Sequence, residues 1–139
     1  KPDITSADAF KKSLLAAKTI AHGNPAGGSA VGVYAVEMFE RLGISAEMKA
    51  KAKLLGDRQL AEAVTKGEVE IGIAQISQIV PWPGMQLVGP LPPELQNITL
   101  FAAGVGTSSK EPEVAKALIR FITSPSAIRV IKANGMDPG

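Results

Sequence analysis

The stretch from Thr19 to Gly43, TIAHGNPAGGSAVGVYAVEMFERLG, joins a short apolar run, a glycine-rich loop and an amphipathic segment. The apolar run Thr19 to Ala21 predicts the end of a strand. The segment Ala30 to Leu42 predicts a helix, which Gly43 terminates. The loop between them, His22 to Ser29, contains three glycines. A strand, a loop and a helix in this order are typical of α/β folds.

This glycine-rich loop is a candidate anion-binding site. The first amides of a helix have no partner inside the helix, and the helix dipole adds partial positive charge there. Glycine lets the backbone come close to a ligand, and Ser29 could cap the helix or donate its hydroxyl to that ligand. The loop is neither a P-loop nor a dinucleotide fingerprint, because Gly-Lys-Ser/Thr is missing and Gly27, Gly28 and Gly32 have the wrong spacing. The open alternative is a tight turn that binds nothing.

Composition excludes several classes of protein. The chain has 139 residues, 45% of them hydrophobic, which suits one folded domain. The net charge is only +2 and both signs are spread along the chain, which argues against a nucleic-acid surface. There is no cysteine and one histidine, His22, so we predict no disulfide, metal site or cofactor. No run is long and apolar enough to span a membrane.

The rest of the chain alternates helical and strand patterns. Helices are predicted after Thr5 or Ser6, at Ala46 to Lys49, at Asp57 to Lys66, at Gln75 to Ile79, and after Pro112 and Ser124. Strands are predicted at Ala50 to Leu55, Val69 to Ala74, Met85 to Val88 and Ile98 to Val105. This alternation predicts an α/β fold with a mainly parallel sheet flanked by helices.

Ligands of such sheets lie beyond the carboxyl ends of the strands, near helix N-termini. Two loops qualify, Gly23 to Ser29 and Gln75 to Ser77, and we predict a binding site where they meet. A hydrolase or isomerase that uses Ser29 or Ser77 would need a base. His22 is the only histidine, and a histidine in a loop is usually solvated. The sequence therefore predicts binding without catalysis, and no enzyme.

A family resemblance rests on segments that cover nearly the whole chain. They are PDITSADAFKKSLLAAKTIA, GNPAGGSAVGVY, ERLGI, EAVTKGEVEIGIAQISQI, VGPLPPELQ and KEPEVAKALIRFITSPSAIRVIKANGMDPG. In these segments the chain resembles the bacterial extracellular solute-binding proteins of the molybdate-binding-protein-like group. The resemblance implies the type 2 periplasmic binding protein fold, in which two α/β lobes clamp a ligand between them.

The resemblance also implies a domain organisation. Residues 1–84 would form the second lobe, residues 85–97 would cross the hinge, and residues 98–139 would be the C-terminal part of the first lobe. The N-terminal part of that lobe has no counterpart here, so the chain is expected to be a fragment. The implied function is that of the solute-binding component of an ABC-type uptake system, in the periplasm or outside the cell, with a membrane permease as partner. The effector-binding domain of a transcription regulator is the alternative.

The implied ligand is a small anion, either an oxyanion such as molybdate or a small organic carboxylate. By the resemblance, backbone amides would face it at Gly28, Ser29, Ala30 and Val31. Gln75 and the helix start at Gly56 to Leu60 would contribute further contacts. Molybdate binders often carry an aromatic hydroxyl near the position of Gln75 and a shorter Asp-Pro loop, so the sequence leaves the choice of anion open.

A homodimer is a further expectation from the sequence. The strand predicted at Ile98 to Val105 is apolar and would lack the neighbours that a whole first lobe supplies. An unpaired apolar strand tends to recruit another chain. We therefore predict a dimer or higher oligomer formed through the segment Ile98 to Gly139.

Overall fold

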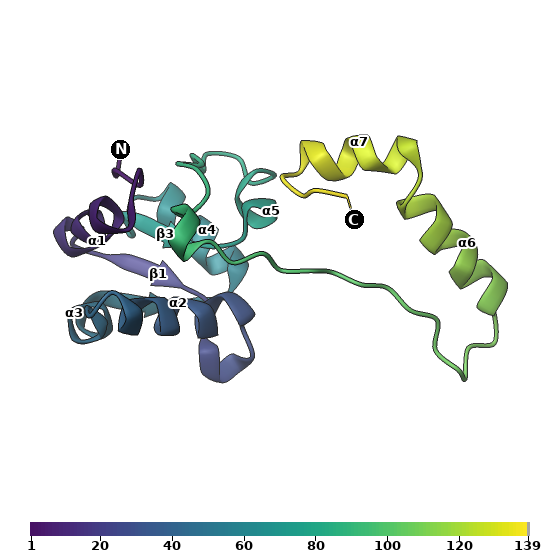
Figure 1. Ribbon diagram of the computed structural model, residues 1–139, viewed down its shortest axis with the longest axis horizontal. Coiled ribbons are helices and arrows are strands. Elements are labelled where there is room, and N and C mark those ends of the chain that lie inside the picture. Colours follow the sequence, from purple (N-terminus) through teal and green to yellow (C-terminus); the bar gives the residue numbers. More distant parts are fainter. Residues whose placement is uncertain (139) are drawn as a thin grey trace. The chain divides into compact units, whose positions relative to one another are not determined.

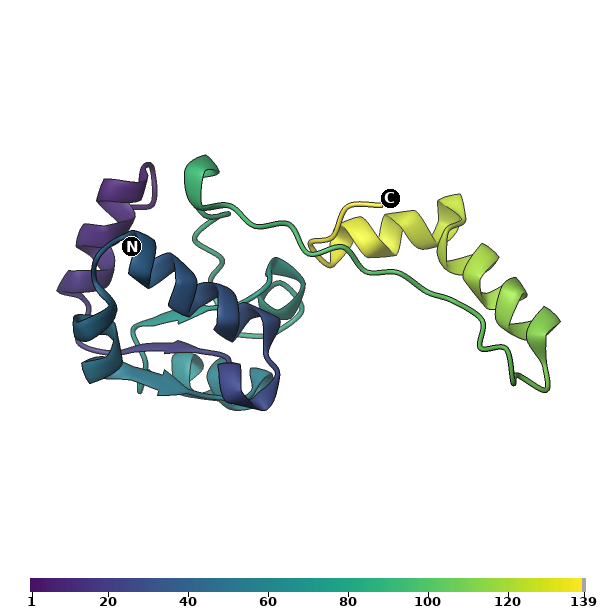
Figure 2. The same ribbon diagram turned by 60° about the horizontal axis from the view of Figure 1, so that its bottom comes forward.

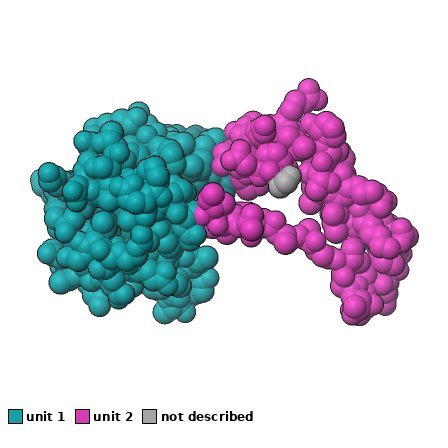
Figure 3. All heavy atoms as spheres, in the orientation of Figure 1, with its two compact units in different colours: residues 1–97 teal, residues 98–139 magenta. Residues whose placement is uncertain are grey.

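The structure is a computed structural model that describes residues 1–138, and it divides into two compact units at residues 97 and 98 (Figure 3). Unit 1 contains all three strands and most of the helices. Its elements are α1 (Ala7–Ala16), β1 (Ile20–His22), η1 (Pro25–Gly27), α2 (Ala30–Arg41), α3 (Ser45–Lys51), β2 (Ala52–Leu54), α4 (Asp57–Thr65), β3 (Ile71–Ile73), α5 (Ile76–Ile79) and η2 (Pro93–Leu95). Unit 2 contains α6 (Pro112–Ile122) and α7 (Pro125–Ala133). No helix among residues 1–138 is long and apolar enough to cross a membrane.

The three strands form one parallel sheet in the order β2-β1-β3, with β1 in the centre (Figure 1). Ile20 lies opposite Ala52 and Ile71, and His22 lies opposite Leu54 and Ile73. The strands are therefore aligned, and their carboxyl ends lie at the same edge. The prediction of an α/β fold with a parallel sheet flanked by helices is confirmed.

Helices cover both faces of this sheet. Successive side chains of a strand point to opposite faces, so neighbouring residues of β1 enter different cores. Ile20 belongs to a core built with α1, α2 and α3, which includes Phe10, Leu14, Met38, Phe39 and Met48. Ala21 belongs to a second core with Leu60 and Ala63 of α4 and with Val69. Figure 2 shows α2 and α4 on opposite sides of the strands. Because both faces are buried, the central strand is a short run without polar alternation until it reaches His22.

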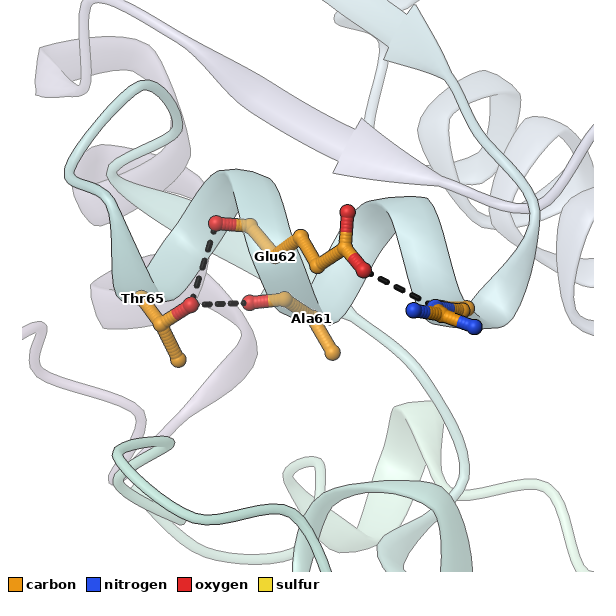
Figure 4. Close-up of polar contacts among 4 residues, drawn as sticks. Ala61, Glu62 and Thr65 are labelled. Atoms are coloured by element: carbon orange, nitrogen blue, oxygen red, sulfur yellow. Dashed lines mark hydrogen bonds and ion pairs between the residues drawn. The ribbon is translucent and has the colours of Figure 1, made fainter.

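Helix α4 packs closely against the sheet at Gly72. A Cβ atom at Gly72 would lie only 2.9 Å from Leu60 Cδ2 and 3.1 Å from Val64 Cγ2, so a side chain there would push the helix outward. At the end of the helix, the Thr65 hydroxyl donates to the carbonyl oxygens of Ala61 and Glu62, at 2.9 and 3.0 Å (Figure 4). The Glu62 carbonyl also accepts from Lys66 N at 3.0 Å, so the hydroxyl of Thr65 adds a second donor to the last turn.

Several predicted element boundaries differ from those in the structure. Ser6, rather than Thr5, caps α1, since its hydroxyl oxygen accepts from Ala9 N at 3.1 Å. The lysine- and alanine-rich run that was predicted as a strand from residue 50 begins as helix α3, and only Ala52–Leu54 pairs with β1. Lysine and alanine are good helix formers, so the helix continues until pairing with β1 replaces it.

The strands predicted at Met85 to Val88 and at Ile98 to Val105 are wrong. Neither segment has a helix or strand assignment in the structure. A strand needs a neighbour to pair with, and the sheet among the described residues contains only β1, β2 and β3. Met85 instead packs its side chain against the second core. In the other segment, Leu100 and Phe101 are 89% and 69% exposed.

The segment that ends unit 1 is fixed to α1 and α2. The Tyr34 hydroxyl donates to the carbonyl oxygen of Leu95, and Arg41 Nη2 donates to that of Glu94 at 2.9 Å. Glu94 Oε1 accepts from Ala7 N at 3.1 Å, at the start of α1, and Leu95 is buried. Glu94 and Leu95 are thus held by helices α1 and α2. The assignment of the chain to two lobes and a hinge stays a prediction.

Lys51 closes the C-terminal end of α1. Its Nζ atom donates to the carbonyl oxygens of Leu14, Leu15 and Ala17 at 2.7, 2.8 and 2.6 Å. The last carbonyl groups of a helix have no partner within it, and the helix dipole favours a cation there. This single side chain therefore joins α3 to the end of α1.

Replacing Lys51 by methionine keeps the apolar stem and removes the three donors. We expect Lys51→Met to lower the free energy of unfolding by about 1.5–3 kcal/mol, since carbonyl groups lose a charged donor. Lys49 on the same helix is exposed and serves as the control, so Lys49→Met should change stability by no more than about 0.5 kcal/mol. Urea unfolding followed by circular dichroism measures both, and equal midpoints for the two variants would contradict the assignment.

Candidate ligand-binding site at the carboxyl edge of the sheet

Three loops leave the sheet at its carboxyl edge, and each leads into a helix. β1 continues into the loop 23–29 and α2, β2 into residues 55–56 and α4, and β3 into residues 74–75 and α5. Leu55 N donates to the carbonyl oxygen of His22 at 3.0 Å, which holds the first two loops together at their origin. The sequence predicted that the loop Gly23 to Ser29 meets the segment Gln75 to Ser77. These follow β1 and β3, which are neighbouring strands that end at the same edge.

The loop after β1 is fixed by its own hydrogen bonds. Asn24 Oδ1 accepts from Ala26 N at 3.0 Å, and the Asn24 carbonyl accepts from Gly27 N and Ser29 N at 3.1 and 3.2 Å. Gly28 has a φ of 82°, a left-handed conformation that glycine adopts without strain. The loop is therefore organised before any ligand arrives, which reduces the entropy that binding would cost.

Two free amides lie at the start of α2, on Ala30 and Val31. Neither donates to an acceptor among residues 1–138. The amide of Gly28 is used inside the turn, by the carbonyl of Pro25 at 3.1 Å, and that of Ser29 by Asn24. The Ser29 hydroxyl oxygen caps the helix by accepting from Gly32 N at 3.1 Å, and its own proton stays available to a ligand.

Gly23 and Gly32 allow β1 and α2 to approach each other closely. A Cβ atom at Gly32 would lie 2.2 Å from the carbonyl oxygen of Gly23, and one at Gly23 would lie 2.0 Å from Ser29 Oγ. The sequence suggested that glycine would admit a ligand, whereas Gly32 makes room for the backbone of Gly23, and Gly23 makes room for the side chain of Ser29. The sequence shows one glycine at the start of the loop and the other in the first turn of the helix, but not the contact between them.

His22 is buried, which corrects the expectation of a solvated loop histidine. It is the last residue of β1, is 2% exposed, and faces the same side of the sheet as Ile20. Its ring lies edge-on to Phe39 of α2, with ring centroids 5.6 Å apart and the planes at 66°. Nδ1 lies 2.8 Å from the carbonyl oxygen of Gly23. Since a carbonyl oxygen only accepts, Nδ1 carries the proton in the neutral ring.

Burial lowers the pKa of His22 below its usual value of 6.5, and the bond to Gly23 opposes this only in part. The unfolded chain therefore binds a proton more readily than the folded chain. We expect the free energy of unfolding to fall as the pH is lowered through about 6.5 toward the pKa of the folded state, and to be insensitive to His22 above that window. Urea midpoints between about pH 8 and about pH 5 measure the effect.

His22→Asn is the control for this pH dependence, because asparagine does not titrate in the same range. Glu62 and Glu94 have lowered pKa values, so they contribute only below about 4.5, their usual value. Wild type and His22→Asn should therefore diverge as the pH falls below 6.5, and should run in parallel only below the pKa of the folded state. Identical slopes in the upper window would show that the ring of His22 is not responsible.

Gln75 lies at the same edge, as the residue that precedes α5. Its backbone amide donates to Gln78 Oε1 at 3.0 Å, and its side-chain amide bonds to no other described residue. Gln78 Nε2 donates to Asp57 Oδ2 at 2.7 Å, which links α5 to the first turn of α4. The sequence missed this link, because residues 57 and 78 are far apart in the chain. No group of three potential metal ligands gathers among residues 1–138.

Residues 1–137 match the family of bacterial extracellular solute-binding proteins. The chain belongs to this family. The family resemblance is therefore confirmed, and the parallel sheet flanked by helices fits a periplasmic binding protein fold. Over 139 residues the chain is 33% identical to a protein from Pseudomonas sp. named aconitate isomerase, a match that covers 99% of this chain and 52% of the relative. The chain thus spans about half the length of that relative.

This relative contradicts the prediction that the protein is not an enzyme, because its name is that of an enzyme. The prediction rested on the lack of a nucleophile and base pair. That lack argues only against nucleophilic catalysis, since a proton transfer needs acid–base groups and no nucleophile. It was also drawn from a chain that spans about half of the relative, so it took no account of the groups in the other half of that relative.

Proposed function

We propose that this chain forms a lobe that binds a small organic acid anion, of the chemical class of aconitate, at the carboxyl edge of its sheet. The observation that carries the proposal is the pair of free amides on Ala30 and Val31 at the start of α2. The identity of 33% with a protein named for aconitate supports a carboxylate rather than a metal oxyanion such as molybdate.

The chemistry of this edge suits a carboxylate. Two neighbouring N–H groups can donate to the two oxygens of one carboxylate, at the helix end where the dipole favours negative charge. The Ser29 hydroxyl and the Gln75 side-chain amide add donors for a second acidic group. Gly28 has open space where its Cβ would be, so no side chain obstructs the approach.

Titration with aconitate, citrate, molybdate and sulfate tests this proposal, with amide resonances followed by NMR. We expect the carboxylates to shift the resonances of Ala30, Val31 and Gly32, and molybdate and sulfate to have little effect. Binding of molybdate without binding of the carboxylates would overturn the choice of ligand. Shifts confined to residues far from 28–31 and 75 would overturn the choice of site.

A second candidate function is isomerisation of the bound acid by a longer protein, of the relative's length, that would contain this lobe, and the name of the relative favours it. The alternative is that the longer protein delivers the acid to a membrane permease of an ABC-type system in the periplasm, as the family suggests. Incubation of the longer protein with one isomer of aconitate distinguishes the two. Appearance of the other isomer supports isomerisation, and tight binding without conversion supports delivery.

We further propose that unit 2 mediates association of two copies of the chain. Val114, Leu118 and Phe121 lie on one side of α6, at intervals of four and three residues, and each is at least 60% exposed. Within unit 2 these side chains remain exposed, and a contiguous exposed apolar face favours association. The dimer that the sequence suggested would thus use a helix face rather than a strand.

Light scattering after size exclusion measures this association over a range of concentrations. We expect a dimer in the wild type, and Leu118→Glu should shift it to the monomer, because a charge in the apolar stripe would be buried without a partner. Lys116→Gln, on the same helix but outside the stripe, is the control and should leave the dimer intact. A wild type that stays monomeric at high concentration would refute the proposal.

A further inference from the structure

The carbonyl group of Gly23 is held between the last residue of β1 and the first turn of α2. On one side, His22 Nδ1 donates to its oxygen at 2.8 Å. On the other side, Gly32 packs so closely that a Cβ atom there would lie 2.2 Å from the same oxygen. The position of this carbonyl therefore decides how closely α2 can approach the sheet.

The same peptide also faces the residue that caps α2. A Cβ atom at Gly23 would lie 2.0 Å from Ser29 Oγ, and Ser29 Oγ accepts from Gly32 N at 3.1 Å. Any rotation of the Gly23 peptide would displace the Ser29 cap or the first turn of α2. The free amides of Ala30 and Val31 lie between Ser29 and Gly32 in the chain. A displacement of Ser29 or Gly32 would therefore move these amides too.

The ring of His22 has its own supports. It is almost fully buried and lies edge-on to Phe39, which lies about two turns beyond the first turn of α2. The backbone of His22 is held from the other direction, since its carbonyl accepts from Leu55 N at 3.0 Å. The ring is thus placed by β2 and by the body of α2, and it transmits that placement to the loop.

We propose that His22 is a positioning residue for the anion site, and that its ring N–H fixes the Gly23 carbonyl and through it the amides of Ala30 and Val31. The inference rests on the proposed function only in taking a small organic acid anion as the ligand of these amides. The geometry that it describes belongs to the chain alone. An apolar ring or side chain could fill the same space against Phe39, but it would leave the Gly23 carbonyl without its donor.

Three substitutions separate this role from simple packing. His22→Leu removes the donor, His22→Asn places an N–H at the same number of bonds from Cβ as Nδ1, and His22→Gln places it one bond further away. The readouts are the ring nitrogen resonances of His22, the amide resonances of Ala30 and Val31, and the affinity for aconitate measured by NMR titration.

We expect the wild-type ring to carry its proton on Nδ1, and His22→Asn to keep the amide resonances and bind aconitate within about threefold of wild type. His22→Leu and His22→Gln should shift those resonances and weaken binding by about tenfold or more. Should the leucine variant fail to fold, the asparagine and glutamine pair still decides the matter.

A wild-type ring protonated on Nε2, or a leucine or glutamine variant with unchanged amide resonances, would overturn the role of His22. If the wild type does not bind aconitate at all, the proposed function fails on its own. The amide resonances then still decide whether His22 positions the start of α2, because that measurement needs no ligand.

Discussion

Replacing Ala30 by proline should weaken aconitate binding by roughly ten- to hundredfold while leaving the fold intact. Ala30 is the first residue of α2, and its amide has no protein acceptor among residues 1–138. Proline removes this N–H, and a hydrogen bond to a charged group contributes about 1.5–3 kcal/mol, which corresponds to that loss in affinity. The substitution therefore tests whether this one N–H group binds the anion.

The backbone around Ala30 already suits proline. Proline is favoured at the first helical position, and it needs an extended residue before it. Ser29 has φ −71° and ψ 112°, which is extended, so we expect the free energy of unfolding to change by less than about 1 kcal/mol. Ala30→Gly keeps the amide and is the matched control, which should bind within about threefold of wild type. Equal affinity for the proline and glycine variants would place the ligand elsewhere.

Replacing Gly32 by alanine should destabilise unit 1 by about 3 kcal/mol, or prevent it from folding. The new Cβ atom would lie 2.2 Å from the Gly23 oxygen, 2.7 Å from the Gly23 carbonyl carbon and 2.9 Å from Pro25 N. All three are backbone atoms, so none can turn aside as a flexible side chain would. Without such a clash, alanine in place of glycine inside a helix stabilises by up to about 1 kcal/mol, so the expected sign is reversed.

Gly27→Ala provides the comparison for this prediction. Its nearest neighbour would be Asn24 Cβ at 3.6 Å, an ordinary contact, so stability should stay within about 0.5 kcal/mol of wild type. Urea unfolding followed by circular dichroism measures both variants. A Gly32→Ala variant as stable as wild type would show that the helix can move away from β1, and the fixed approach of α2 inferred from the close contact would then be wrong.

The sequence alone was sufficient to predict much of unit 1. The run from Thr19 to Gly43 predicted a strand, a loop and a helix, and the structure has β1, η1 and α2 in that order. Ser29 as a cap and Gly43 as a terminator were predictable because caps depend on residues next to each other in the chain. The family followed from segments spread over the whole chain, and the comparison with known proteins confirmed it.

The sequence failed where an element depends on a distant partner. Ile98 to Val105 has the composition of a strand, yet no described strand pairs with it, and it is not one. Catalysis was wrongly excluded for a related reason. The exclusion considered only the residue types of a chain that spans about half of the relative, and residue types alone say little about the groups that surround a ligand.

Only the tertiary structure decided the role of His22 and of the two close glycines. In the sequence, His22 looks like the first residue of a polar loop, and nothing marks it as buried. The structure makes it the end of the central strand, because β2 and β3 pair with it on both sides and Phe39 covers its ring. Neighbours along the chain determine caps and turns, whereas burial and close approach are set by the packing of segments that are far apart in the sequence.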